Sequence, residues 1–210
     1  MNQIKAILFD MDGVLIDAKE WHFMAFNRAL KLFGLDLNHQ EHILKYDGLP
    51  TKDKLELLTL EKDLPKSLHS FINEIKQIYT LDEIYAKCKP FYAHEFALSR
   101  LKNEGFFLGV CTNSVRKTME VALEKAMIIQ FFDILFSNQD VEKSKPNPEI
   151  YNKCMKKLCV SPLQTLILED NEHGINAAIA SGAHLLKIKS INDVNYETIK
   201  KKIEEINKQI

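Results

Sequence analysis

Neither sign of charge is in excess in this sequence, because 28 lysine and arginine residues are balanced by 29 aspartate and glutamate residues. Such a chain has no strongly basic surface, so we expect neither nucleic acid nor an anionic membrane as a partner. No apolar run approaches the length of a transmembrane helix. The first residues lead straight into an expected strand and leave no room for a signal peptide, so we expect a cytoplasmic protein.

Cysteine is also scarce. The four cysteines form no Cys-x-x-Cys pair, and no histidines are interleaved with them in a zinc-binding pattern. We therefore expect reduced, buried thiols rather than disulfide bonds or a zinc site. With 46% hydrophobic and 27% charged residues, the 210-residue chain has the composition of an ordinary globular protein.

The apolar run of residues 6–9 predicts a strand that is buried on both faces of a parallel sheet. Apolar patterning predicts four further strands, at residues 106–111, 134–137, 165–168 and 184–188. Helical spacing predicts helices between and after them, at residues 114–126, 148–158 and 173–181 and from about residue 195. This alternation predicts an α/β fold with a parallel sheet and right-handed crossovers.

The stretch between the first two strands contains no convincing strand of its own. Helical spacing instead predicts helices at residues 18–34, 40–45, 54–60, 68–79 and 81–89. We therefore expect a discontinuous core domain of residues 1–16 and 90–210, carrying an inserted α-helical cap of residues 17–89.

Two pairs of acidic residues follow expected strands. Asp10 and Asp12 come after the first strand, and Glu169 and Asp170 come after a later one. The carboxyl ends of parallel strands meet at one sheet edge, where two carboxylates about 4 Å apart repel by roughly 4 kcal/mol. Single acids are usually solvated loop residues, but two pairs at two strand ends favour a cation, and hard carboxylate oxygens select magnesium. Such a site attracts phosphate.

Polar and basic residues are expected beside these acids. Thr112, Asn113 and Ser114 follow the second strand, and Ser114 is placed at the start of a helix whose free N–H groups suit an anion. Taken alone, such residues are usually only helix caps. Lys145 lies just before another helix, where a lysine can neutralise a phosphate and hold a nucleophilic carboxylate.

These motifs resemble the haloacid dehalogenase superfamily, in particular its phosphatase and β-phosphoglucomutase-like group with an α-helical cap. The resemblance covers nearly the whole chain and implies a Rossmann-like core. It is carried by four ordered motifs: Asp10-Met-Asp-Gly-Val, Cys111-Thr-Asn, Lys145-Pro-x-Pro-Glu-Ile-Tyr, and Leu168-Glu-Asp followed by Gly174. Relatives usually have glycine where this chain has Ser144.

The resemblance implies a two-step mechanism. Asp10 attacks phosphorus and becomes an aspartyl phosphate, while Asp12 protonates the departing alcohol and later takes a proton from water. Thr112, the Asn113 backbone N–H and Lys145 hold the phosphoryl oxygens. The cofactor is Mg²⁺, held by Asp10, the backbone carbonyl of Asp12 and Asp170, with Glu169 either a direct ligand or just behind the ligands. Dehalogenases of the superfamily lack the acid at position 12, so dehalogenation is disfavoured.

Cap residues are expected to select the substrate. The candidates are Glu20 and His22 on the first cap helix and the loop around Gly48. His22 resembles a mutase histidine that couples substrate binding to the acid at position 12, although it could equally be a packed helix residue. Arg116, in the core, resembles a basic residue that mutases place near the substrate phosphate.

Three functions are considered: a phosphatase, a phosphosugar mutase, and a non-catalytic binding protein on the same fold. The binding protein is disfavoured because Asp10, Asp12 and Lys145 are all present. A mutase grips a second phosphate, for which relatives use an arginine three residues after the loop glycine. Here Thr51 occupies that place and Lys52 follows it. We therefore favour a phosphatase acting on a small phosphorylated metabolite, such as a sugar phosphate or another short phosphorylated alcohol. The oligomeric state is left open.

Overall fold

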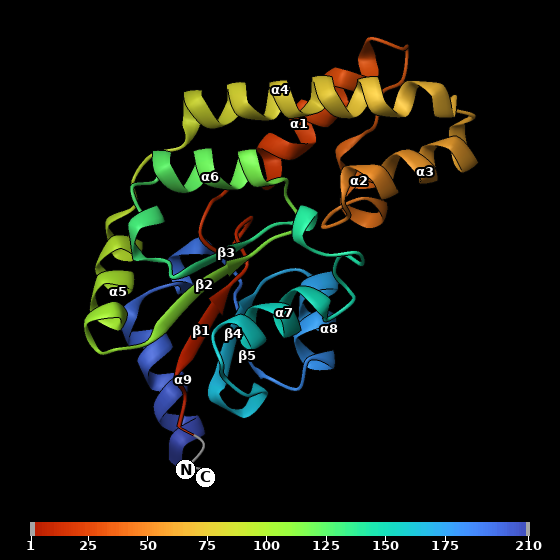
Figure 1. Ribbon diagram of the computed structural model, residues 1–210. Helices are drawn as coiled ribbons and strands as arrows, with labels where there is room; N and C mark the ends of the chain where they lie inside the picture. Colours follow the sequence, from red (N-terminus) through yellow and green to blue (C-terminus); the bar gives the residue numbers. More distant parts are fainter. Residues whose placement is uncertain (1–2, 209–210) are drawn as a thin grey trace. The chain divides into compact units, whose positions relative to one another are not determined.

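The computed structural model describes residues 3–208, and its contacts divide the chain into two compact units (Figure 1). One unit comprises Met1–Asp17 and Lys89–Ile210, and the other comprises Ala18–Cys88. These junctions lie within one residue of the expected domain boundaries. The roles of the two units as catalytic core and cap remain a prediction.

The first unit is built on a five-stranded sheet in which every pairing is parallel. The strand order is β3-β2-β1-β4-β5, so the first strand lies at the centre. The strands are β1 (Ala6–Phe9), β2 (Phe107–Cys111), β3 (Ile134–Phe136), β4 (Thr165–Glu169) and β5 (His184–Lys187). All five lie within one or two residues of the predicted strands.

Helices cover both faces of this sheet. On one face α7 and α8 pack against each other and the sheet, and on the other face α5 contacts both β2 and α9 (Figure 1). The helices of this unit are α5 (Tyr92–Asn103), α6 (Arg116–Lys125), α7 (Glu149–Lys157), α8 (Glu172–Ala180) and α9 (Tyr196–Lys208). The predicted α/β fold with a Rossmann-like parallel sheet is therefore confirmed.

The central strand is apolar because both of its faces are covered. All four residues of β1 are fully buried. Leu8 packs into the cluster formed with α7 and α8, and the ring of Phe9 meets the edge of Phe132 at 5.9 Å between centroids. Burial of a large apolar side chain contributes about 1.5–3 kcal/mol, so this strand anchors the unit.

The register of the sheet brings three strand ends to one level. Phe9, the last residue of β1, is paired with Val110 on β2 and with Leu168 on β4. The residues that come next on these strands, Asp10 and Glu169 among them, therefore lie side by side at the carboxyl edge. This edge is where open α/β sheets bind their ligands.

The second unit is helical. Its α-helices are α1 (Lys19–Lys31), α2 (His39–Lys45), α3 (Thr51–Lys62) and α4 (His69–Lys87). The long helices α1 and α4 pack against each other. Their apolar sides meet α3 in a core that includes Phe26, Leu30, Leu55, Leu58 and Ile72.

In two places the helices differ clearly from the sequence-based expectations: one predicted break is absent, and one helix was not predicted. Residues 68–79 and 81–89 were expected as separate helices, but α4 runs without interruption from His69 to Lys87. Thr80, which lay between the two predicted helices, is buried within α4, and its hydroxyl donates to the carbonyl of Lys76 at 2.9 Å. The helix α5 was not expected, because its inner face includes His94 while Tyr92 and Phe96 are exposed.

The cysteines follow the predicted pattern with one exception. Cys88, Cys111 and Cys154 are buried thiols outside any disulfide bond, whereas the thiol Cys159 is exposed. Among residues 3–208, none of the helices has the length and apolar content needed to cross a bilayer.

A buried histidine should make folding sensitive to acid. Burial, followed by the nearby Lys54, lowers the pKa of His42 from 6.5 to about 4. The unfolded chain therefore binds this proton before the folded chain does, so stability is full above pH 6.5 and falls as the pH drops towards 4. We expect a loss of about 2 kcal/mol from this residue, after allowance for solvent screening.

Urea unfolding on either side of this pH range checks the expectation. The His42→Gln variant should have a lower free energy of unfolding than the wild-type protein at neutral pH. On acidification, this free energy should fall less in the variant than in the wild-type protein. An equal loss in both proteins would show that His42 does not titrate as described.

Candidate active site

Asp10 and Asp12 lie on a compact turn at the end of β1. The backbone N–H of Asp10 still donates to Leu168 at 3.0 Å, which extends the pairing with β4 by one residue. The carbonyl of Met11 then accepts three N–H groups, from residues 14, 15 and 16. Gly13 adopts a φ of 88°, a conformation that favours glycine, and this bends the chain back after Asp12.

Lys145 lies at the centre of the acidic groups. Its Nζ is 2.7 Å from Oδ1 of Asp10 and 2.6 Å from Oε1 of Glu169. It also donates to the carbonyl oxygen of Cys111 at 2.7 Å. The residue is only 4% exposed, so this ion pair is shielded from solvent.

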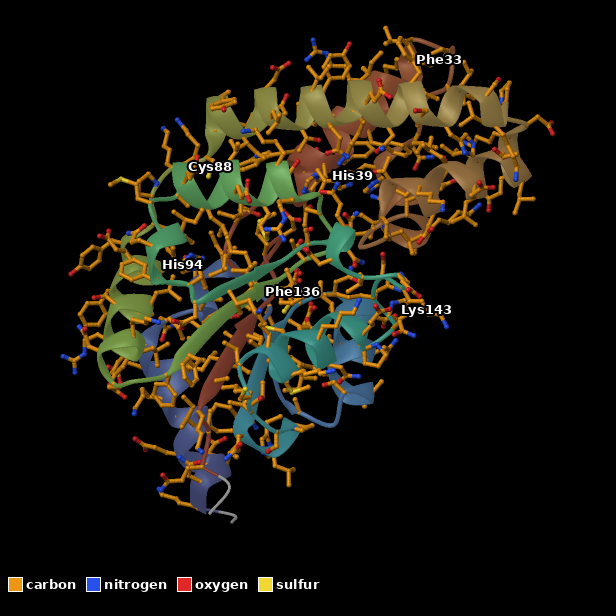
Figure 2. The ribbon with its side chains drawn as sticks, viewed as in Figure 1. Phe33, His39, Cys88, His94, Phe136 and Lys143 are labelled. Carbon is orange, nitrogen blue, oxygen red and sulfur yellow. The ribbon has the colours of Figure 1, made fainter. Side chains whose placement is uncertain are left out.

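Two side chains hold the loop that carries Lys145. This loop includes Lys143, which is labelled in Figure 2. The amide of Asn113 accepts from the backbone N–H of Lys145 at 3.2 Å and donates to its carbonyl at 3.4 Å. The carboxylate of Glu149 accepts the backbone N–H groups of residues 142 and 143. The helix α7 begins at Glu149, one residue later than predicted. The side-chain oxygen of Asn147 accepts the backbone N–H of Glu149.

The charges in this cluster strongly influence one another. Burial and then Glu169 raise the pKa of Asp10 well above its usual value, while Lys145 opposes this shift. Burial acts to lower the pKa of Lys145, but the carboxylates of Asp10 and Glu169 outweigh it and raise the pKa. Lys145 therefore stays charged, and Asp10 needs further positive charge to ionise readily.

The same residues fit a divalent metal ion. Asp10, Glu169 and Asp170 each offer a carboxylate oxygen, and these three atoms lie within 4.8 Å of one another. An all-oxygen donor set suits Mg²⁺, and a cation there would oppose the repulsion that raises the pKa of Asp10. The donor chemistry therefore fits the expected cofactor.

Thr112 and Ser114 form a second polar group beside the acids. Ser114 donates its hydroxyl to Oδ2 of Asp12 at 2.7 Å, and its backbone N–H donates to the hydroxyl of Thr112 at 3.0 Å. The expectation that Ser114 begins a helix is wrong, because α6 begins at Arg116 with Val115 as its N-cap. The Ser114 hydroxyl orients an acid instead of capping a helix.

Comparison with known proteins identifies this arrangement. The family of haloacid dehalogenase-like hydrolases matches residues 7–188, which is most of the chain. The chain belongs to this family. The resemblance noted in the sequence is thus confirmed, and so is the prediction of a hydrolase.

Two named relatives of this haloacid dehalogenase-like hydrolase are a pyrophosphatase and a carbohydrate phosphatase. The chain is 29% identical over 198 residues to the pyrophosphatase PpaX of Oceanobacillus iheyensis, covering 92% of this chain and 87% of that one. It is 25% identical over 193 residues to a phosphorylated carbohydrates phosphatase of Thermotoga maritima, covering 90% and 88%. The β-phosphoglucomutase of Clostridium difficile shares the fold, with a TM-score of 0.82, 24% identity and coverage of 97% and 98%.

The structure brings together the predicted residues that follow the strands of the sheet. Asp10, Lys145 and Glu169 are joined by ion pairs, Asp170 completes the possible metal group, and Ser114 links Thr112 to Asp12. Arg116 is engaged elsewhere, because its guanidinium donates to both carboxylate oxygens of Asp140 at 2.8 and 2.7 Å. A substrate role for Arg116 remains a prediction.

The predicted cap residues belong to the helical unit. Glu20 pairs with His39 at 2.9 Å, and Nδ1 of His22 lies 3.3 Å from Nζ of Lys76. Gly48 adopts a φ of 73° in the loop before α3. Thr51 is the first residue of α3, and Lys52 is exposed in its first turn. Their roles in binding substrate remain predictions.

Tyr151 and Gly174 contribute to the site in ways the sequence did not reveal. Tyr151 donates its hydroxyl to Oε1 of Glu169 and is fully buried. Gly174 faces the same carboxylate, because a Cβ at this position would lie 2.0 Å from Oε1 of Glu169. Both residues occur in the motifs quoted above, but only the structure connects them with Glu169.

Gly174→Ala should displace the carboxylate of Glu169. The new methyl group cannot fit unless Glu169 moves, and Glu169 is held by Lys145 and Tyr151. We expect kcat/KM to fall about 100-fold, because a displacement of about 1 Å at a catalytic group can have this effect. The melting temperature should also fall, because overpacking a buried site costs about 1–3 kcal/mol.

The control is the same substitution in a Glu169→Ala background. There the clash is gone, and alanine is favoured over glycine within a helix by about 0.5–1 kcal/mol. The melting temperature should then stay the same or rise. An equal fall in both backgrounds would show that Glu169 is not the group that requires glycine.

Proposed function

We propose that this protein is a Mg²⁺-dependent phosphatase that hydrolyses a small phosphomonoester through an aspartyl phosphate on Asp10. The observation that carries the proposal is the contact of Lys145 with Oδ1 of Asp10, at 2.7 Å, inside a cluster of carboxylates. One oxygen of Asp10 is thereby fixed on a permanent cation. The ion pair favours the ionised carboxylate that a nucleophile must be, and a bound Mg²⁺ would supply the further positive charge that Asp10 needs.

In the first step, an oxygen of Asp10 forms a bond to phosphorus while the bond from phosphorus to the leaving alcohol breaks. Asp12 supplies the proton to the leaving oxygen. In the second step, water attacks the phosphorus of the aspartyl phosphate, Asp12 takes a proton from this water, and Asp10 is released. The hydrogen bond from Ser114 to Oδ2 of Asp12 supports this role, because it fixes the orientation of the acid.

The hydroxyl of Thr112 and the backbone N–H of Asn113 would hold the phosphoryl oxygens, and Lys145, whose three N–H groups already donate to protein acceptors, would attract these oxygens by its charge. Asp10, Glu169 and Asp170, with the backbone carbonyl of Asp12, would hold the metal ion. When bound, Mg²⁺ supplies positive charge between these carboxylates and the phosphoryl group. The close spacing of three carboxylate oxygens supports this assignment.

The cap sequence supports a phosphatase over a phosphosugar mutase. A mutase holds a second phosphate, but Thr51 stands where mutase relatives have arginine, at the beginning of α3. A phosphatase needs no second grip. The named relatives also favour hydrolysis, and the relative from Thermotoga maritima supports a sugar phosphate as the substrate.

Inorganic pyrophosphate is a second candidate substrate. The specific observation is the 29% identity to a protein named as a pyrophosphatase, across 92% of this chain. Phosphate is a better leaving group than an alcohol, so this reaction would depend less on the proton from Asp12. The same site residues would otherwise serve both reactions.

Phosphate release from a panel of substrates tests the proposal. We expect release from sugar phosphates or other short phosphorylated alcohols, loss of that release when the metal is chelated, and recovery when Mg²⁺ is restored. Release from pyrophosphate alone would favour the second candidate. A requirement for a sugar bisphosphate would favour the mutase, and no release with any substrate and Mg²⁺ would contradict the proposal.

A further inference from the structure

Tyr151 lies behind the ion pair of Lys145 and Glu169. Its hydroxyl donates to Oε1 of Glu169, the same oxygen that accepts from Lys145. Its ring centroid is 5.0 Å from Nζ of Lys145, within the range of a cation–π contact. A tyrosine hydroxyl carries its proton at neutral pH, so it acts as the donor in this bond.

Lys145 is oriented by the acceptors around it. An ammonium group has three hydrogens, and here it donates to Oδ1 of Asp10, to the carbonyl of Cys111 and to Oε1 of Glu169. The carbonyl is fixed within β2, so the position of Glu169 decides how Lys145 faces Asp10. Any movement of Glu169 would be passed on to Asp10.

Glu169 is itself held on several sides. Gly174 leaves just enough space for its carboxylate, and the backbone N–H of Asp170 is 3.3 Å from Oε2. Tyr151 adds a neutral hydroxyl on the other oxygen, beside Lys145. Because the whole group is buried, each of these hydrogen bonds contributes more than it would in water.

We propose that Tyr151 is a positioning residue: its hydroxyl fixes Glu169, which in turn holds Lys145 against the nucleophile Asp10. The proposal rests on the proposed function for its account of Asp10 as nucleophile. In this proposal Tyr151 does not touch the substrate and acts through Glu169 and Lys145. Its loss should therefore lower kcat, because Asp10 would be held in its reactive orientation for less of the time.

The chain contains a matched control for this arrangement. Tyr196 on α9 donates its hydroxyl to Glu104, and Lys200 donates to the other oxygen of Glu104 at 2.6 Å. This second Tyr–Glu–Lys group is partly exposed and has no part in the candidate site. Replacing either tyrosine by phenylalanine removes one hydroxyl from a lysine-bound glutamate.

The experiment compares Tyr151→Phe with Tyr196→Phe at saturating Mg²⁺. Loss of this hydroxyl should let Glu169 and Lys145 shift, and a small displacement near the nucleophile strongly slows the reaction, so Tyr151→Phe should lower kcat by about 10-fold or more. KM should stay within about twofold of wild type, since the substrate contacts remain, and Tyr196→Phe should leave both constants unchanged. Wild-type kcat in Tyr151→Phe would overturn the proposal.

A double-mutant cycle tests whether Tyr151 acts through Glu169. In a Glu169→Ala background, Tyr151→Phe should cause no further loss of kcat, because the group it positions is gone. An equal fractional loss in both backgrounds would overturn the proposal.

A measurement without substrate separates this proposal from the proposed function. Nuclear magnetic resonance of protein with ¹⁵N-labelled lysine reports how fast the ammonium protons of Lys145 exchange with water. Exchange should be slow in wild type and in Tyr196→Phe, and faster in Tyr151→Phe. Unchanged exchange in Tyr151→Phe would overturn the positioning role, whereas a wild-type protein inactive on every phosphate ester would overturn the proposed function alone.

Discussion

The site depends on the crowding of buried carboxylates around the ammonium group of Lys145. Buried charges are costly unless they are paired and hydrogen-bonded, and the Nζ of Lys145 meets Asp10 and Glu169 directly. Glu169 in turn accepts from Tyr151, and Asn113 holds the backbone of the lysine. A fold tolerates such a concentration of acid charge only when every member is held, and the same arrangement favours a metal ion and a phosphoryl group.

The parallel sheet makes this crowding possible. Because Phe9 is in register with Val110 and Leu168, the chain leaves three strands at the same height and on the same edge. The apolar residues of β1 bury this register between two layers of helices, so the acids cannot slide apart without unpairing the centre of the sheet. The stability of the core and the geometry of the site therefore have one origin.

The sequence predicted whatever depended on apolar runs and their ends. The strands and the meeting of Asp10 with Glu169 and Asp170 are of this kind, because strand ends in a parallel sheet gather at one edge. It did not predict features decided by hydrogen bonds between distant residues. The hydroxyl of Ser114 donates to Asp12 and does not cap a helix, and the hydroxyl of Tyr151 donates to Glu169. The apolar pattern of α5 was hidden because His94 takes an inner position.

The most direct test of this account is to trap the phosphorylated enzyme. The protein is mixed with a substrate it hydrolyses and Mg²⁺, quenched in acid, and treated with borohydride, which reduces an acyl phosphate to an alcohol. Mass spectrometry of the peptides should then find homoserine in place of aspartate at position 10, and none in an Asp10→Asn variant. Rapid hydrolysis with no modified residue, or with modification at a position other than Asp10, would contradict the account.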